Sequence, residues 1–126
     1  QVSKMSLPPW QSPKDEDSYL LLMLPWLEQI LSDVHEGNPG AENLLGVLYG
    51  MDRYIPKDRE REQYWLEQSA AQGYIPAMDN LARAAIREGD EELGRTLAIR
   101  AAKKGSKAAF QWCVEHVSPA EYATTG

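Results

Sequence analysis

The residues of this chain that could do chemistry are few, and their spacing limits what that chemistry could be. The histidines are His35 and His116, and the single cysteine, Cys113, stands three residues before His116. A Cys-x-x-His pair can place two metal ligands on one helical face, but a zinc site needs further protein ligands, and the sequence has no second pair. As a nucleophile and its base, the pair would need an exposed, electropositive setting for the thiol. We therefore predict no metal site, no catalytic residue and no cofactor.

Two other short runs have simpler structural explanations. Residues 37–40 (Gly-Asn-Pro-Gly) carry two glycines, but helix caps account for them better than a phosphate-binding loop does. Residues 90–92 (Asp-Glu-Glu) are consecutive acids, whereas a calcium loop alternates its ligands, so we expect a helix to begin there. The sequence thus predicts that the chain is not an enzyme.

Composition and charge narrow the class of partner. The 126 residues, 43% hydrophobic and 25% charged, fit one globular domain. A formal net charge of −6 argues against nucleic acid or an anionic membrane as the partner. Acids dominate residues 1–52, whereas the charges of residues 93–114 are all basic: Arg95, Arg100, Lys103, Lys104 and Lys107. This polarity suits the steering of a protein partner, although two solvated faces without a partner explain it equally well.

The most apolar segment, residues 19–27, is interrupted by Pro25. A membrane span needs about twenty apolar residues, so we predict a core helix, or two helices broken at the proline, and no membrane span. Before this segment, Pro8, Pro9 and Pro13 predict an extended arm over residues 1–18. The single cysteine excludes an internal disulfide and is compatible with an oxidising or a reducing compartment.

A repeat organises the rest of the chain. Its members are apolar or small side chains and a helix-capping aspartate at fixed offsets. In the second half of the unit, Asp58, Trp65, Ala70 and Gly73 recur 32 residues later as Asp90, Leu97, Ala102 and Gly105. In the first half, Ala41, Leu45, Gly46 and Tyr49 recur 36 residues later as Ala77, Leu81, Ala82 and Ala85. Such a period is typical of stacked helix–turn–helix units.

Each repeated position has a predicted structural role. Glycine is expected in the left-handed turns that end helices, at Gly37, Gly73 and Gly105. Side chains suited to helix N-caps are Asn38, Asp58, Asp90 and Ser106. Small residues that would let neighbouring helices approach closely are Gly46, Ala70, Ala82 and Ala102. Cys113 aligns with Leu45 and Leu81, which predicts a buried, packed thiol.

The first unit carries a family resemblance. It resembles a Sel-one-like repeat, a relative of the tetratricopeptide repeat, in the string Ala41-x3-Leu45-Gly46-x2-Tyr49-x5-Ile55-x2-Asp58-x2-Arg61-x3-Trp65-x3-Ser69-Ala70-x2-Gly73. It departs from the family where residues 52–54 replace a loop glycine pair and where Glu62 replaces an alanine. The resemblance implies an all-α chain, a short α-α superhelical solenoid of about two repeats with capping helices at both ends. The expected repeats are residues 38–73 and 74–105, the C-terminal cap is 106–117, and the domain is 19–126.

The resemblance also implies a partner-binding face. If the chain curves as tetratricopeptide relatives do, the first helix of each unit lines the concave side. The residues expected there are Asn43, Val47, Met51, Asp79, Arg83, Arg87, Gln111 and Glu115. Arg83 and Arg87 stand one helical turn apart and could hold a carboxylate of the partner by forked hydrogen bonds. A solvated arginine face explains the same pair equally well.

Function follows from the resemblance only as an expectation. Bacterial members of the family often act as periplasmic or secreted adaptors, and some short ones resemble immunity proteins that neutralise secreted toxins. This implies a non-enzymatic protein–protein interaction module, with a toxin effector as partner and the periplasm favoured over the cytoplasm. The alternative is an adaptor or scaffold for a larger complex, docked through the acidic N-terminal end. A homodimer through residues 19–34 and a weak β-lactam-binding activity, known from disulfide-rich relatives, are further alternatives.

Overall fold

The computed structural model describes residues 13–125, and all regular structure in that range is helical. The elements are α1 (Pro13–Met23), the short 3-10 helix η1 (Pro25–Leu27), α2 (Glu28–His35), α3 (Pro39–Met51), α4 (Arg59–Ala71), α5 (Ile75–Arg87), α6 (Glu91–Lys103), α7 (Lys107–His116) and α8 (Pro119–Thr124). The predicted all-α class is confirmed.

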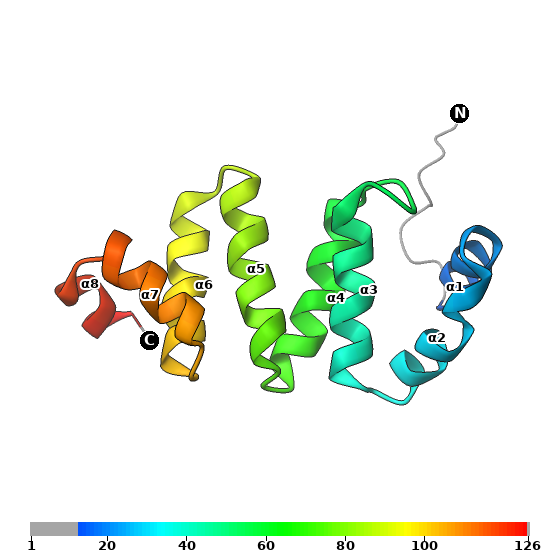
Figure 1. The fold of residues 1–126 in the computed structure, drawn as a ribbon, viewed down its shortest axis with the longest axis horizontal. Helices are drawn as coiled ribbons and strands as arrows, with labels where there is room; N and C mark the ends of the chain where they lie inside the picture. The colour runs from blue at the N-terminus through cyan, green and yellow to red at the C-terminus, as the bar shows by residue number, and fades with distance from the viewer. Residues whose placement is uncertain (1–12, 126) are drawn as a thin grey trace.

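The helices are arranged in chain order. Each helix from α3 to α6 packs against the next one along the chain, and Figure 1 shows a row that runs from α1 at one end to α8 at the other. The hairpins α3–α4 and α5–α6 fall within residues 38–73 and 74–105, and α7 falls within residues 106–117. The small helix α8 was not predicted, although Ser118 caps it by accepting a hydrogen bond from Glu121 N at 3.1 Å.

The predicted helix boundaries rest on local capping rules, and the structure confirms them. The side chains of Asn38, Asp58, Asp90 and Ser106 each accept a hydrogen bond from a first-turn backbone amide at 3.0–3.1 Å. Gly37, Gly73 and Gly105 have φ of 82°, 86° and 116°, the left-handed region that residues with a Cβ rarely adopt. In the α3–α4 connection, where the family has glycines, Asp52 takes a left-handed φ of 54°.

One predicted boundary differs from the structure. Residues 13–18 were expected to be extended, but α1 begins at Pro13. Proline is compatible with the first turn of a helix because its missing N–H would have no partner there. The remainder of the predicted arm, residues 1–12, lies outside the described residues. The predicted break at Pro25 is confirmed, because α1 ends at Met23 and η1 begins at Pro25.

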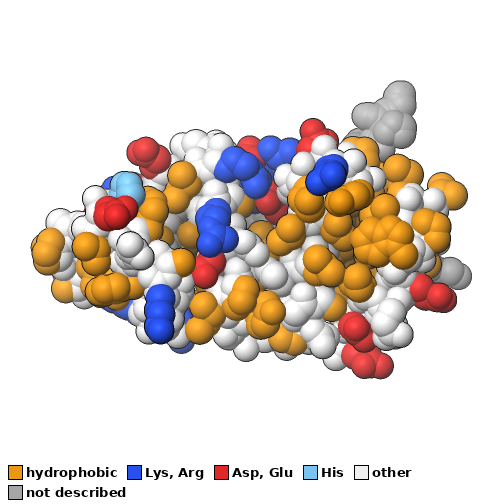
Figure 2. Space-filling model, viewed as in Figure 1, with side chains coloured by type: hydrophobic (Ala, Val, Ile, Leu, Met, Phe, Trp, Pro, Cys, Tyr) orange, Lys and Arg blue, Asp and Glu red, His pale blue; other side chains and the backbone are white. Residues whose placement is uncertain are grey.

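The core has two parts. A cluster at the N-terminal end joins α1, η1, α2 and α3 and includes Leu20, Leu27, Leu45 and Tyr49. A second cluster joins α5, α6 and α7 and includes Ala82, Ala98, Ile99 and Cys113. Figure 2 shows that hydrophobic side chains also gather at the surface over α3 and the α1–α2 end. The predicted burial of the cysteine is confirmed, and this burial raises the pKa of the Cys113 thiol.

The hairpin α3–α4 depends on a close approach at Gly46. A Cβ at this position would lie 2.8 Å from Cγ of Leu66 and 3.1 Å from its backbone nitrogen. Both helices would have to move apart to admit a methyl group, because one of the two atoms belongs to the backbone. The small residue predicted at this position is therefore required by the packing.

Each hairpin has a second close contact between its helices, in which a glycine faces a large side chain. The glycine is on the first helix in α3–α4 and on the second helix in α5–α6. In α3–α4, Gly50 leaves the space that the Glu62 side chain fills. At the equivalent positions of α5–α6, Ile86 is the large residue, and Gly94 is the small one; a Cβ on Gly94 would lie 2.5 Å from Cγ1 of Ile86. Glu62 is thus matched by a glycine on the facing helix, Gly50.

A buried carboxylate docks α1 onto the first hairpin. Glu16 Oε2 accepts hydrogen bonds from Tyr49 Oη at 2.5 Å and from Trp65 Nε1 at 2.9 Å. Burial raises the pKa of Glu16 above its ordinary value of 4.5, and the two hydrogen bonds and the charge of Arg61 oppose that rise. Burial and the neighbouring carboxylate also raise the pKa of Tyr49 well above its ordinary value, so its hydroxyl keeps its proton and donates.

The close approach at Gly46 can be tested by adding one methyl group. We expect Gly46→Ala to lower the free energy of unfolding by about 1–3 kcal/mol through overpacking, partly offset by about 1 kcal/mol of helix propensity. The control is Gly40→Ala in the same helix, where the nearest atoms belong to the side chains of Asn38 and Tyr74. Urea unfolding measures both variants. Equal stability of the two variants would contradict the account.

The buried carboxylate predicts a pH dependence with a definite sign. Because the folded-state pKa of Glu16 is raised, its contribution to stability is complete below the unfolded pKa and is lost as pH rises through the folded pKa. Glu16→Gln keeps an acceptor for both donors but cannot ionise, so we expect it to gain stability relative to the parent chain between about pH 4 and pH 7. Denaturant unfolding across this range measures the difference. The exposed Glu60→Gln serves as control, and a difference that does not change with pH would refute the assignment.

Candidate functional site

A groove lies between α5 and α7 and contains three of the predicted site residues. Asp79, Arg83 and Arg87 line it from α5, and Trp112 lines it from α7. Its floor is formed by small and apolar side chains, namely Ala82, Ile86, Ala98, Ala108 and Ala109. The cavity measures about 450 Å³. We call it the α5–α7 groove.

Of the two arginines that line this groove, Arg83 is the one that no carboxylate of residues 13–125 holds in an ion pair. Its side chain is exposed, and Nη1 donates to Asn80 Oδ1 at 3.1 Å. Asn80 is neutral, and within residues 13–125 no carboxylate forms an ion pair with Arg83. A guanidinium that holds only a neutral amide can still bind a carboxylate with its remaining N–H groups.

Arg87 is the second arginine that was predicted to bind a carboxylate of the partner. In the structure it binds two carboxylates of its own chain. Nη2 donates to Glu62 Oε1 at 2.7 Å, and Nε donates to Glu88 Oε2 at 2.9 Å. The bonds to Glu62 and Glu88 raise the pKa of Arg87. The hydrogen bond from Lys57 Nζ at 2.6 Å, together with the one from Arg87, lowers the pKa of Glu88. The Glu62 side chain is only 4% exposed and has Arg59 3.6 Å away as its other cation. Arg87 therefore joins the two hairpins.

Asp79 has a structural contact as well. Its Oδ1 accepts a hydrogen bond from Ser106 Oγ at 2.6 Å. The same hydroxyl oxygen accepts from the Ala109 amide and so caps α7. Asp79 thus fixes the start of the helix that forms the far wall of the groove.

The predicted residues of the first unit lie outside this groove. Asn43 contacts the second hairpin, where its Oδ1 accepts from Asn80 Nδ2 at 3.0 Å. Val47 is half-buried in α3, and Met51 is exposed at the end of that helix. The eight residues therefore do not form one continuous lining.

The predicted residues of α7 lie on another part of its surface. Gln111 and Glu115 are both exposed. Gln111 lines a separate shallow hollow with the exposed side chains of Phe110 and Val114.

Trp112 is the groove residue that the sequence analysis did not place. It is half-buried, and its indole ring stacks on the ring of His116 with centroids 4.4 Å apart. The helical spacing of Trp112 from Ala108 and Ala109, one turn earlier, was the sequence signal that could have placed it on the groove wall. An aromatic wall and an adjacent arginine are the residue types that most often carry binding energy at protein interfaces.

The structure separates Cys113 and His116, the two residues weighed as metal ligands or as a nucleophile and its base, by their exposure to solvent. Cys113 is 2% exposed, whereas His116 is exposed and its Nδ1 lies 2.9 Å from the carbonyl oxygen of Trp112. Over residues 13–125, His, Cys, Asp and Glu side chains form no cluster that could hold a metal ion. In the same range, no helix has the length and apolar character to cross a membrane.

Comparisons with known proteins do not assign this chain to a family. The chain matches no protein-family model, no curated protein and no solved structure. The resemblance to Sel-one-like repeats therefore stays a prediction.

Proposed function

We propose that this chain is a non-enzymatic protein-binding module whose partner occupies the α5–α7 groove. The observation that carries the proposal is that the exposed Arg83 and the half-buried Trp112 line the same groove together with small and apolar side chains. Trp and Arg are enriched among residues that dominate binding energy, and a guanidinium beside a partly enclosed apolar surface can bind a carboxylate bidentately. The partner is expected to present an acidic residue flanked by an apolar side chain.

The proposed biological role is that of an immunity protein that binds and neutralises a secreted bacterial toxin. This role rests on the family resemblance and on the prediction from the sequence that the chain has no catalytic residue. An inhibitor that acts by binding alone needs one rigid face, and the ion pairs around Arg87 and the cap at Ser106 hold the groove walls in place. An adaptor would bind its partner without abolishing the partner's activity.

Stoichiometry separates these roles. We expect the chain to form a 1:1 complex with the product of the adjacent gene and to abolish its toxicity when the two are present in equal amounts, because a binder has no turnover. Light scattering of the co-purified complex and a titration of toxin activity measure this. Inhibition by far less than one equivalent would indicate an enzyme, whereas a complex that leaves the toxin active would indicate an adaptor. No complex, with a neighbour unrelated to toxins, would refute the immunity role.

The two arginines of the groove should separate binding from stability. We expect Arg83→Ala to weaken the complex by at least about tenfold while changing the free energy of unfolding by less than about 0.5 kcal/mol. Arg87→Ala leaves the Glu62 carboxylate without its nearest cation, so we expect a loss of about 1–2 kcal/mol, moderated by the partial exposure of the guanidinium. Calorimetry of binding and thermal unfolding measure the two effects, with the exposed Arg53→Ala as control. Normal affinity of the Arg83 variant would remove the groove from the binding site.

A further inference from the structure

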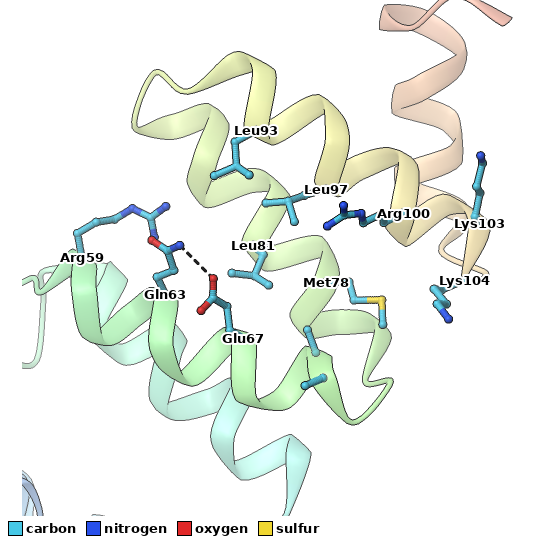
Figure 3. A pocket seen from close by; sticks show the side chains of 12 residues that line it. Arg59, Gln63, Glu67, Met78, Leu81, Leu93, Leu97, Arg100, Lys103 and Lys104 are labelled. Atoms are coloured by element: carbon cyan, nitrogen blue, oxygen red, sulfur yellow. Dashed lines mark hydrogen bonds between the residues drawn. The ribbon is translucent and has the colours of Figure 1, made fainter. Parts of the chain in front are cut away.

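A second groove lies between α4 and α6, with α5 as its floor. Figure 3 shows Met78 and Leu81 on α5 and Leu93 and Leu97 on α6 turned toward this space. Ala70 and Ala71 line the groove at the C-terminal end of α4. The cavity measures about 440 Å³ and shares no lining residue with the α5–α7 groove. We call it the α4–α6 groove.

Basic side chains stand at one end of this groove. Arg100 and Lys104 lie at the C-terminal end of α6 together with Lys103, as Figure 3 shows. The ammonium group of Lys103 already has partners within the chain, because Nζ donates to the carbonyl oxygen of Thr125 and lies 5.1 Å from the centre of the Tyr122 ring. Arg100 and Lys104 are exposed, and neither forms an ion pair with another residue of the described range 13–125.

Carboxylates within the groove do not neutralise this end. The acidic residue among the lining side chains is Glu67 on α4, whose Oε2 accepts a hydrogen bond from Gln63 Nε2 at 3.0 Å. Arg59, at the opposite end, has Glu62 as its ion-pair partner. The groove therefore combines an apolar floor with one end of unbalanced positive charge.

We propose that the α4–α6 groove binds an amphipathic helix of a protein partner that carries acidic residues at one end. A helix presents apolar side chains at i, i+3, i+4 and i+7 along one face, which suits a trough between two helices. The acidic end of that helix lies against Arg100 and Lys104, where charge complementarity fixes its direction. This second site goes beyond the proposed function, because it uses different faces of α5 and α6.

The test uses a synthetic peptide as the probe and the full chain as the receptor. The peptide is an amphipathic helix of about fourteen residues, or about four turns, with leucines on one face and glutamates at one end. A second peptide replaces the glutamates with lysines, and a third scrambles the leucine pattern. We expect saturable 1:1 binding of the acidic peptide by fluorescence anisotropy, at least about tenfold weaker binding of the lysine peptide, and no saturable binding of the scrambled one.

Two protein variants locate the binding. Arg100→Glu combined with Lys104→Glu should reverse the preference between the acidic and the lysine peptide. The control variant, Arg53→Glu combined with Lys107→Glu, makes the same change in net charge outside the groove. It should keep the preference for the acidic peptide. Ala71→Trp adds bulk at an exposed position that lines the groove, so it should abolish binding while thermal unfolding stays unchanged.

Three results would overturn the proposal. The first is equal affinity for the acidic and lysine peptides, and the second is acidic-peptide binding that survives both the charge reversal and Ala71→Trp. The third is a free chain that light scattering shows to be a dimer and that the Arg100→Glu, Lys104→Glu variant converts to a monomer, because a second copy would then be the occupant.

Discussion

The structure depends on how closely the two helices of each hairpin can approach. In α3–α4, the bare Cα of Gly46 leaves room for Leu66, including its backbone nitrogen. In α5–α6, the bare Cα of Gly94 does the same for Ile86. Because each helix of this row packs mainly on its neighbours in the chain, the spacing within a hairpin affects the grooves that its helices line. Glycine at these contacts therefore governs the surface as well as the core.

The contact between the hairpins is polar, and it follows from the same packing. Gly50 makes room for Glu62, and the Glu62 carboxylate then meets Arg87 of the next hairpin at 2.7 Å. A buried carboxylate needs such a partner, since an unpaired charge in that position would be costly. One consequence is that Arg87 supports the groove wall, whereas Arg83, one turn earlier, is exposed and donates to the neutral side chain of Asn80. Two arginines that line the same groove thus differ in their contacts with the rest of the chain.

Local rules explain why much of the fold could be predicted from the sequence. Asn38, Asp58 and Ser106 cap helices because short polar side chains reach the free amides of the next turn, which depends on neighbours in sequence alone. The start of α1 at Pro13 was missed because a proline after other prolines was interpreted as part of an extended arm. The role of Glu16 could not be predicted, because its donors Tyr49 and Trp65 are brought to it only by the tertiary fold.

The candidate site was only partly predictable for the same reason. The resemblance to Sel-one-like repeats implied a shared face for Asp79, Arg83 and Arg87 on α5, and in the structure all three line one groove. It did not reveal that Ser106 and Glu62 engage two of them. The central claim is that a protein partner binds the α5–α7 groove, and hydrogen–deuterium exchange of the chain with and without the adjacent-gene product tests it most directly. The account predicts slower exchange in α5 and α7 of the complex; slowing confined to α1–α3 would contradict it.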